Sequence, residues 1–407
     1  MKTALLCIGD ELLKGSVLNT NLAFLGEILL KNGILPECSI EIPDRAESIR
    51  SALDYAFSLA SVVITSGGLG PTADDITKET IADYFGVPLE NDLELENHLK
   101  ESWARTHQTP LPYHWLRQSM VPRGAVILPN KVGSAPGLLL KKEGRTLFML
   151  PGPPVEQAPM LLESVIPRLT AALDEPLYSA LLHVVGIGES AVEEKVKPIL
   201  HDGLSAAYCA SPGHVKLYFT SRTESVIREA VKESNRIFAG DILTTGAQNL
   251  AEEVLNLLGE KKLMLATAES CTGGLISGAL TAIPGSSNVF LGGAATYSNE
   301  LKMKFLGVRE ETLAQFGAVS MPCAKEMADG ICARTGADAG ISVTGIAGPG
   351  GGTPEKPVGL VYIGASLSGK TIVKECRFHG GRDRVRASAV SFALNLLRKM
   401  LIGKEME

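Results

Sequence analysis

The 407-residue sequence is poor in aromatic residues and carries no excess of basic charge. Aromatic residues make up 5% of the chain, and 45 acidic residues against 39 basic ones give a net charge of −6. Proteins that bind nucleic acid over an extended surface are normally basic, so this balance argues against a nucleic-acid partner. No run approaches the roughly 18 uninterrupted apolar residues that a membrane span needs, so we expect no membrane partner either.

Cysteine and histidine pairs at metal-binding spacing are also missing. The seven cysteines are scattered, with no C-x-x-C spacing, and the seven histidines are dispersed. This distribution is typical of reduced cytosolic thiols and not of disulfides or a zinc site, so we expect a cytoplasmic protein. The first residues, 1–7, predict a strand and not a signal peptide. Any metal would have to be held by carboxylates, which favours a hard divalent cation.

Glycine is abundant, and two glycine-rich turns each follow an apolar run. Residues 61–66 lead into Gly67-Gly68-Leu69-Gly70-Pro71-Thr72, and residues 339–343 lead into residues 344–352. A strand that ends in such a turn exposes backbone N–H groups, which can bind phosphate or another anion. Because the two turns lie far apart in the chain, we predict two separate small-molecule sites.

The order of apolar runs and helical patterns predicts an α/β protein with three domains. Over residues 1–174, strands at 4–8, 35–42, 62–66, 125–128 and 146–150 alternate with helices at 22–31, 46–60, 75–85 and 155–173. This alternation predicts a mostly parallel sheet with helices on both faces. Residues 175–246 predict a small α+β linking module, with residues 244–247 as a candidate linker, and residues 247–407 return to an α/β pattern.

Acidic residues follow two predicted strands of the N-terminal domain. Asp10 and Glu11 follow the first strand, and Asp74 and Asp75 follow the first glycine-rich turn. Asp74 or Asp75 alone could simply cap the next helix. Four acids at the ends of adjacent strands repel one another, however, unless a cation or protons intervene. We therefore predict a divalent metal that is held by these acids and bridges phosphate oxygens, as in a pyrophosphatase.

Ser270 lies in the turn between a strand and a helical pattern that begins at Leu275. A hydroxyl at such a turn can act as a nucleophile while helix N–H groups stabilise an oxyanion. No histidine lies nearby in sequence, but Tyr297 and Lys302 follow, and a lysine of lowered pKa or a tyrosine can activate a serine. Two alternatives stay open: Cys271 is a competing nucleophile, and Ser270 with Thr272 could be ordinary helix caps.

Cations that could bind a monophosphate follow the second glycine-rich turn. Lys356 comes shortly after residues 345–352, and Arg382, Arg384 and Arg386 follow Gly380-Gly381. Together with the turn's amides, these cations suit a phosphate. The alternative is a solvated first helical turn, whose start Asp383 would favour.

The N-terminal motifs resemble the CinA family, the competence/damage-inducible proteins. The resemblance lies in residues 9–15, 67–77, 129–137 and 151–154, with Lys131 where the family usually has proline. It implies the fold of molybdopterin-binding proteins and a metal-dependent ADP-ribose pyrophosphatase that uses Mg, Mn or Co. By this resemblance Asp10, Glu11, Asp74 and Asp75 lie at the active centre, with Asp74 and Asp75 also catalytic. The residues implied around the phosphates are Gly67, Gly68, Gly70 and Thr72.

The C-terminal motifs are similar to the C-terminal domain of the same family, which occurs alone as a nicotinamide-mononucleotide deamidase. The matching stretches are residues 267–274, 284–287, 296–302, 317–320, 344–352, 356–359 and 380–386. The resemblance implies hydrolysis of the carboxamide to the acid and ammonia without a metal. By this resemblance Ser270 is the nucleophile, and Tyr297 and Lys302 activate it or carry protons. Thr344 lies at the reaction centre. Either Arg382 or Arg386 binds the phosphate. The other implied substrate contacts are Thr272, Gly273, Gly274, Asn299, Gly345, Gly348 and Gly350.

Taken together, these features predict a two-enzyme protein that recycles pyridine nucleotides and acts on nicotinamide mononucleotide and ADP-ribose. The resemblance also implies a homodimer. One rival is an N-terminal domain that binds a pterin or nucleotide without hydrolysing it, although binding alone does not require four acids. A second rival is a non-enzymatic adaptor in DNA uptake or repair, which the acidic charge balance disfavours.

Overall fold

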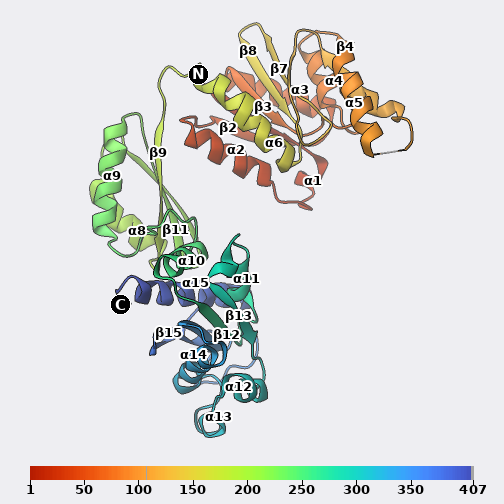
Figure 1. Ribbon diagram of the computed structural model, residues 1–407. Coiled ribbons are helices and arrows are strands. Elements are labelled where there is room, and N and C mark those ends of the chain that lie inside the picture. The colour runs from red at the N-terminus through yellow and green to blue at the C-terminus, as the bar shows by residue number, and fades with distance from the viewer. Residues whose placement is uncertain (107, 405–407) are drawn as a thin grey trace. The chain divides into compact units, whose positions relative to one another are not determined.

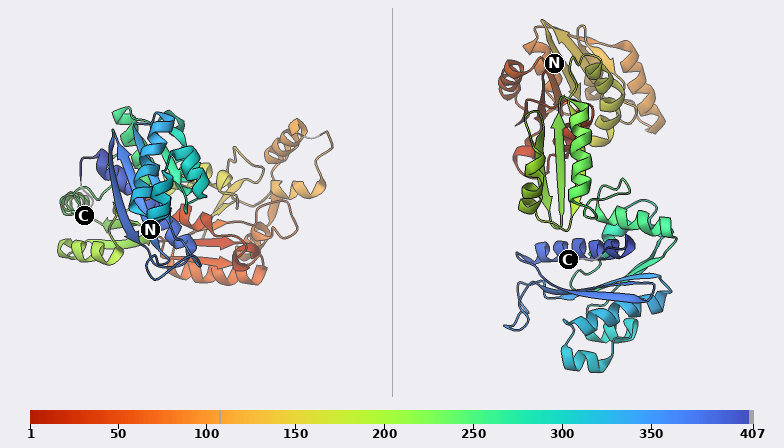
Figure 2. Two further views of the ribbon diagram at one scale, coloured as in Figure 1. Left: turned by 90° about the horizontal axis from the view of Figure 1, so that it is seen from below. Right: turned by 90° about the vertical axis from the view of Figure 1, so that its left-hand side faces the viewer.

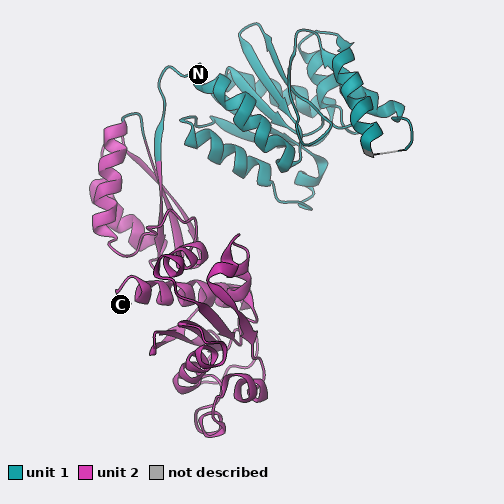
Figure 3. Cartoon of the chain, in the orientation of Figure 1, with its two compact units in different colours: residues 1–179, 221–223 teal, residues 180–220, 224–407 magenta. Residues whose placement is uncertain are grey.

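The computed structural model describes residues 1–106 and 108–404. The chain forms two compact units, one of residues 1–179 with 221–223 and the other of residues 180–220 with 224–407 (Figure 3). Most of the middle module therefore belongs to the same unit as the C-terminal domain. No helix within the described ranges has the length and apolar character that crossing a bilayer requires.

The N-terminal unit is built on a six-stranded sheet with the order β2-β1-β3-β8-β7-β6 (Figure 1). The first four strands in this order are parallel, whereas β7 and β6 pair antiparallel. The predicted mostly parallel sheet is thus confirmed. The strands are β1 (Thr3–Ile8), β2 (Cys38–Ile42), β3 (Val62–Ser66), β6 (Val126–Leu128), β7 (Gly137–Lys142) and β8 (Arg145–Leu150).

Alternate residues of the parallel strands face two helical layers, as the period of two in a strand requires. Leu5, Ile64 and Phe148 pack on one face, whereas Leu6 and Val63 pack on the other. The first face is covered by α2 (Thr20–Lys31) and by α6 (Pro154–Met160), which continues through a π turn into α7 (Ile166–Thr170). The second face is covered by α3 (Ala46–Leu59) and α4 (Thr77–Tyr84). The predicted helices on both faces are confirmed.

Several elements of this unit were not predicted. The strand β7 was missed because its apolar stretch is only three residues long, between Gly137 and two lysines. Between α4 and β6 the prediction contained no element, but the chain forms a short antiparallel pair, a helix and a 3₁₀ helix. The further elements are α1 (Asp10–Leu13), β4 (Leu89–Asn91), α5 (Leu93–Thr106), the 3₁₀ helix Tyr113–Ser119 and β5 (Met120–Pro122).

The middle module has a three-stranded sheet with the order β10-β11-β9. The α+β pattern expected for this stretch is confirmed. Its elements are β9 (Tyr178–Val185), α8 (Glu189–Val196), the 3₁₀ helix Lys197–Ile199, β10 (Ser205–Ser211), β11 (His214–Ser221) and α9 (Glu224–Ile237).

The C-terminal domain has a five-stranded sheet with the order β13-β12-β14-β15-β16. The strands β13, β12 and β14 are parallel, and β15 and β16 continue antiparallel. The long helix α15 lies on one side of this sheet, with α10 and α11, whereas α12 and α14 lie on the other (Figure 2). The elements are α10 (Leu250–Lys261), β12 (Leu265–Glu269), α11 (Leu275–Thr281), the 3₁₀ helix Ser286–Asn288, β13 (Phe290–Ala295), α12 (Asn299–Leu306), α13 (Glu310–Phe316), α14 (Met321–Thr335), β14 (Ala339–Gly345), β15 (Leu360–Leu367), β16 (Lys370–Arg377) and α15 (Arg382–Leu401).

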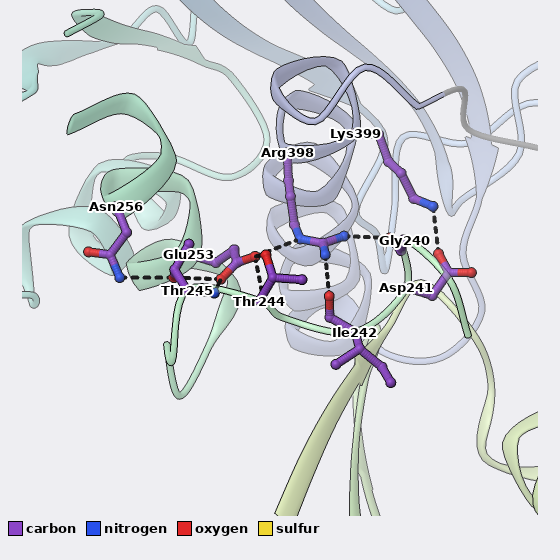
Figure 4. Close-up of polar contacts among 9 residues, drawn as sticks. All are labelled: Gly240, Asp241, Ile242, Thr244, Thr245, Glu253, Asn256, Arg398 and Lys399. Carbon is purple, nitrogen blue, oxygen red and sulfur yellow. Dashed lines mark hydrogen bonds and ion pairs between the residues drawn. The ribbon is translucent and has the colours of Figure 1, made fainter. Parts of the chain in front are cut away.

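A buried ion pair fixes the segment that precedes the C-terminal domain (Figure 4). Arg398 and Glu253 are both fully buried, with their nearest charged atoms 3.4 Å apart. Glu253 accepts hydrogen bonds from the N–H and hydroxyl groups of Thr244 and Thr245, while Arg398 donates to the carbonyl oxygens of Gly240 and Ile242. The candidate linker at residues 244–247 is therefore held against α10 and α15.

The hydrogen bonds to Glu253 also set the sign of its contribution to stability. Burial raises the pKa of this carboxyl, but the hydrogen bonds from Thr245 and Thr244 outweigh burial and hold the pKa below its usual value. A carboxyl whose pKa is lowered on folding stabilises the native state above its unfolded-state pKa. This stabilisation is lost as the pH falls through the pKa of the folded state.

We predict that Glu253→Ala or Arg398→Met lowers the free energy of unfolding of the second unit by about 3–5 kcal/mol, because either change leaves the other charge buried and unpaired. Urea unfolding followed by circular dichroism measures the loss. Lys325→Ala is the control, since it breaks the exposed Lys325–Asp329 pair on α14 and should cost no more than about 0.5 kcal/mol. Equal effects in the Arg398 and Lys325 variants would contradict the prediction.

Candidate active sites

Glu269, at the end of β12, shapes the turn that carries Ser270. Its carboxylate is almost fully buried and accepts the N–H groups of Gly274, Ile276 and Ser277 at 2.9–3.1 Å. It also accepts the Ser277 hydroxyl at 2.8 Å. The carboxylate therefore caps α11, which begins just after the turn. This corrects both the alternative in which Ser270 and Thr272 are the caps and the expectation that these helix N–H groups could serve an oxyanion.

Lys302 comes from α12 and reaches the hydroxyl of Ser270 inside the domain. Its Nζ lies 3.0 Å from Ser270 Oγ, 2.8 Å from the carbonyl oxygen of Thr296 and 3.3 Å from that of Tyr297. The Lys302 side chain is 1% exposed, and no carboxylate in the described part of the chain pairs with it. Burial lowers the pKa of this amine, since a desolvated charge is disfavoured. The predicted neighbours Ser270 and Lys302 are thus brought into direct contact.

Cys271, the competing nucleophile, is buried beside Ser270. Burial raises the pKa of its thiol to about 11, so the thiol is protonated near neutral pH. Because the thiolate is the reactive form of cysteine, this thiol is a poor nucleophile. The environment favours the serine.

The two arginines predicted to bind phosphate have different partners. Arg386 donates to the carbonyl oxygens of Cys271 and Thr272, at 3.1 and 2.9 Å, and so holds the turn that carries the serine. Arg382, the first residue of α15, is exposed and donates to the carbonyl oxygen of Gly348 at 2.9 Å. Arg382 is therefore the freer of the two guanidinium groups.

The remaining predicted residues of this site differ in burial and in hydrogen-bond partners. Thr344 is buried, and its hydroxyl donates to the carbonyl oxygen of Ala318, which links β14 to the loop before α14. The Tyr297 side chain is 64% exposed, and its hydroxyl is 3.5 Å from Arg382. Asn299 is exposed at the start of α12.

The glycines of the C-terminal turns are needed for close approaches. A Cβ at Gly345 would lie 2.7 Å from the carbonyl oxygen of Leu360, and one at Gly348 would lie 2.6 Å from the Val358 side chain. Gly273 and Gly274 have φ angles of 61° and 98°, which a side chain disfavours. Gly350, by contrast, has open space around it.

Lys356 does not serve as a free cation for phosphate. Its ammonium donates to the carbonyl oxygens of Phe316 and Val319, at 2.6 and 2.8 Å. It therefore fastens the loop before α14 to the segment that follows the glycine-rich turn.

In the N-terminal unit, acids from three neighbouring strand ends lie around one cleft of about 490 Å³. Glu11 follows β1, Asp44 follows β2, and Asp74 and Asp75 follow β3; all four line the cleft. Asp10 is outside the lining, and its carboxylate pairs with Lys14 at 3.1 Å. Asp44 was not predicted, although its position directly after a parallel strand was a usable signal.

The environment of Asp44 shows that these acids influence one another. Burial raises the pKa of the Asp44 carboxyl, and the charges of Glu11, Asp10 and Asp74 raise it further, against a lowering by the hydrogen bond from the Asp10 N–H. A cation bound in the cleft would relieve this repulsion.

The first glycine-rich turn is closed by its own side chains. Asp75 accepts the N–H and the hydroxyl of Thr72, so neither Asp74 nor Asp75 caps α4, whose N-cap is Ile76. The N–H of Gly67 donates to the carbonyl oxygen of Leu150 and is not free for a phosphate. Gly67, Gly68 and Gly70 line the cleft, whereas Thr72 does not.

The carboxylates of the cleft fit a metal whose coordination is completed by substrate phosphates and water better than a site formed by the protein alone. In residues 1–106 and 108–404, no three Asp, Glu, His or Cys side chains converge closely enough to hold an ion. Mg²⁺ commonly binds through one or two carboxylates together with substrate phosphates and water. Glu11, Asp44 and Asp74 could supply such carboxylates.

Two family descriptions and full-length relatives match this chain. Residues 247–401 match the family described as "CinA C-terminal domain", and residues 4–171 match "Probable molybdopterin binding domain". A CinA-like protein of Kosmotoga olearia is 42% identical, with 99% of each chain covered. A Thermoanaerobacter pseudethanolicus protein, provisionally named as competence-damage inducible, is 41% identical over the full length of both chains. The chain belongs to the CinA family.

Solved structures of CinA-family proteins cover part of the chain. The crystal structure of the competence/damage inducible protein CihA from Agrobacterium tumefaciens is 47% identical and covers 38% of this chain and 92% of its own, with a TM-score of 0.36. The family matches and the full-length relatives confirm the CinA-family resemblance of the sequence, and the sheets of the two units confirm the predicted mixed α/β fold.

Glu269 is the residue of this CinA-family site that sequence reasoning missed, and its substitution tests the architecture. We predict that Glu269→Ala exposes the 270–281 segment to faster hydrogen exchange and lowers the free energy of unfolding by about 3 kcal/mol or more, because three N–H groups lose a buried acceptor. Exchange measured by mass spectrometry checks this. Thr281→Ala is the control, since the Thr281 hydroxyl bonds only to carbonyl oxygens of its own helix. Unchanged exchange in the Glu269 variant would count against the assigned role.

Proposed function

We propose that the C-terminal domain hydrolyses the carboxamide of nicotinamide mononucleotide, with Ser270 as the nucleophile and Lys302 as its base. The observation that carries this proposal is the contact between Lys302 and the serine hydroxyl. The buried Nζ of Lys302 has no carboxylate partner among the described residues and lies 3.0 Å from Ser270 Oγ. The choice of substrate rests on the CinA-family resemblance of the surrounding motifs.

The three oxygen partners of Lys302 are compatible with a neutral amine that is oriented for proton transfer. A neutral amine has two N–H donors and one lone pair. The carbonyl oxygens of Thr296 and Tyr297 can take both donors. The lone pair is then left facing Ser270 Oγ, which can give up its proton to it.

The reaction then proceeds in two balanced steps. Ser270 Oγ attacks the carboxamide carbon as its proton moves to Lys302, and the N–H of Cys271, the residue after the nucleophile, is placed as an oxyanion donor. The C–N bond breaks as Lys302 returns the proton to the leaving nitrogen, which releases ammonia and leaves an ester on Ser270. Water, deprotonated by Lys302, cleaves this ester to the acid and restores the serine.

The ribose phosphate is assigned to Arg382, with Arg386 as a positioning residue. Arg382 is exposed beside the second glycine-rich turn, and its guanidinium can grip a phosphate through paired N–H donors. Arg386 already donates hydrogen bonds from two of its nitrogens to the carbonyl oxygens of Cys271 and Thr272.

We predict that Ser270→Ala and Lys302→Met each reduce deamidation of nicotinamide mononucleotide by at least about a thousandfold, whereas Cys271→Ala stays within about tenfold of the wild type. Release of ammonia, measured with the purified chain, checks the prediction. Normal turnover by the Ser270 variant, or collapse of activity in the Cys271 variant alone, would exclude the serine mechanism.

The same mechanism predicts a pH profile. The base form of Lys302 is the neutral amine, so kcat/KM should rise with pH through the pKa of Lys302, and burial places this limb below the range of an ordinary lysine. Lys302→Arg should lose activity across the profile, since arginine stays protonated. A profile with no such limb would contradict the role of Lys302.

We also propose that the N-terminal domain cleaves ADP-ribose to AMP and ribose 5-phosphate with a divalent metal. The support is one cleft in which carboxylates from three strand ends face a glycine-rich turn. In this arrangement Glu11, Asp44 and Asp74 would hold the metal, and the metal would neutralise the diphosphate.

We predict that EDTA abolishes ADP-ribose cleavage and that Asp74→Asn reduces it at least about a hundredfold, while Asp10→Asn has a small effect because Asp10 lies outside the cleft lining. The amounts of AMP and ribose 5-phosphate formed measure both effects. Deamidation of nicotinamide mononucleotide in the same samples is the internal control and should not respond to EDTA. Tight pterin binding without metal-stimulated cleavage would favour the binding-only alternative.

A further inference from the structure

Gln118 is a buried side chain in the N-terminal cleft to which the proposed chemistry gives no role. It belongs to the 3₁₀ helix Tyr113–Ser119 and is 1% exposed. It lines the same cleft as the first glycine-rich turn, Asp74 and Asp75.

Both polar atoms of the Gln118 amide lack a hydrogen-bond partner among the described residues. A primary amide can donate two hydrogen bonds and accept two, and buried polar groups in native proteins are nearly always paired. The neighbouring Ser119 follows that rule, since its hydroxyl contacts Asn91 and the carbonyl oxygen of Leu116. The unused capacity of Gln118 therefore points to a partner outside the protein.

The backbone around Gln118 is fastened to the phosphate side of the cleft. Arg117 donates to the carbonyl oxygens of Thr72 and Asp75 and pairs with Glu79. The buried ammonium of Lys78 donates in turn to the carbonyl oxygen of Arg117. These contacts hold the backbone next to Gln118 against the glycine-rich turn.

Two other side-chain amides beside the first glycine-rich turn, those of half-buried Asn21 and buried Gln157, each have one polar atom without a partner. The nitrogens of Asn21 and Gln157 both donate to Ser66 Oγ, at 3.1 and 2.7 Å, while the Oδ1 of Asn21 and the Oε1 of Gln157 have no partner in the described chain. Asn21 lines the cleft together with Gln118. The cleft therefore offers uncharged donors and acceptors as well as carboxylates.

This combination suits a ligand with a polar heterocycle as well as phosphates. A glutamine amide can pair simultaneously with an exocyclic amino group and the adjacent ring nitrogen, as it does with adenine. We propose that Gln118 recognises the amino-substituted heterocycle of the ligand through this pair of hydrogen bonds. The assumption that the ligand's phosphates bind at the glycine-rich turn rests on the proposed ADP-ribose pyrophosphatase activity. Adenine and pterin share this edge, and the experiment separates them.

The test compares AMP with purine riboside monophosphate, which lacks the amino group, by calorimetric titration of the full chain with Mg²⁺. The wild type should bind AMP about tenfold more tightly than the analogue, and Gln118→Met, which keeps the length of the side chain, should abolish that preference. Ser119→Ala, on the same 3₁₀ helix, should retain the preference. A preference that persists in Gln118→Met, together with unchanged binding of 6-hydroxymethylpterin, overturns the inference.

A folding control keeps the experiment decisive. Gln118→Met should unfold at the same temperature as the wild type or higher, because it removes a buried amide that has no partner. If that variant unfolds early, Gln118→Glu replaces the donor nitrogen by oxygen at the same size and should still weaken AMP at least fivefold. Unchanged affinity of Gln118→Glu for both AMP and 6-hydroxymethylpterin overturns the inference as well.

A parallel titration with 6-hydroxymethylpterin identifies the source of the heterocycle. A loss of affinity in Gln118→Met that is confined to AMP assigns adenine, and one confined to the pterin assigns a pterin. A loss with both supports the shared edge, with the tighter wild-type ligand as the assignment, and unchanged affinity for both overturns the inference. The pyrophosphatase is assayed separately with ADP-ribose. Gln118-dependent AMP binding without cleavage would refute the pyrophosphatase alone, whereas cleavage with Gln118-independent binding would refute the inference alone.

Discussion

The contact between Lys302 and Ser270 is the constraint on which the C-terminal site depends. An amine that is almost fully buried without a carboxylate partner is costly to keep charged, so burial lowers the pKa of Lys302. The carbonyl oxygens of Thr296 and Tyr297 give this amine two acceptors and fix its orientation. A lysine held in this way can replace the histidine that the sequence does not place near the serine.

The turn around Ser270 is rigid because charged groups bind its backbone from both sides. Glu269 accepts N–H groups from the start of α11, and Arg386 donates to the carbonyl oxygens of Cys271 and Thr272. Charge-assisted hydrogen bonds are stronger than neutral ones. The carboxylate and the guanidinium therefore hold the backbone of the turn. In the described part of the chain, the Ser270 hydroxyl contacts Lys302 Nζ.

Sequence reasoning found the elements and the chemical types but not the local assignment of hydrogen bonds. The parallel strands and both glycine-rich turns were predictable because a period of two and glycine at positive φ are local signals. Whether Glu269 or Thr272 caps α11, and whether Arg382 or Arg386 is free, depends on contacts between residues far apart in sequence. Asp44 was missed although it follows a predicted strand, and the pairing of β2 with β1 brings it to the other acids.

The two units use the same feature of α/β sheets in opposite ways. In each, a parallel strand ends in a tight turn that leads towards a helix. In the C-terminal domain the acid at the strand end, Glu269, accepts hydrogen bonds from the start of α11, so its charge stabilises the fold. The site itself presents the amine of Lys302 and the hydroxyl of Ser270. In the N-terminal unit Glu11, Asp44 and Asp74 face the cleft, so their charge is available to a cation. This difference in where the carboxylates lie accords with the metal-independent deamidase and the metal-assisted pyrophosphatase that we propose, because a hard cation needs oxygen ligands that the protein has not already used.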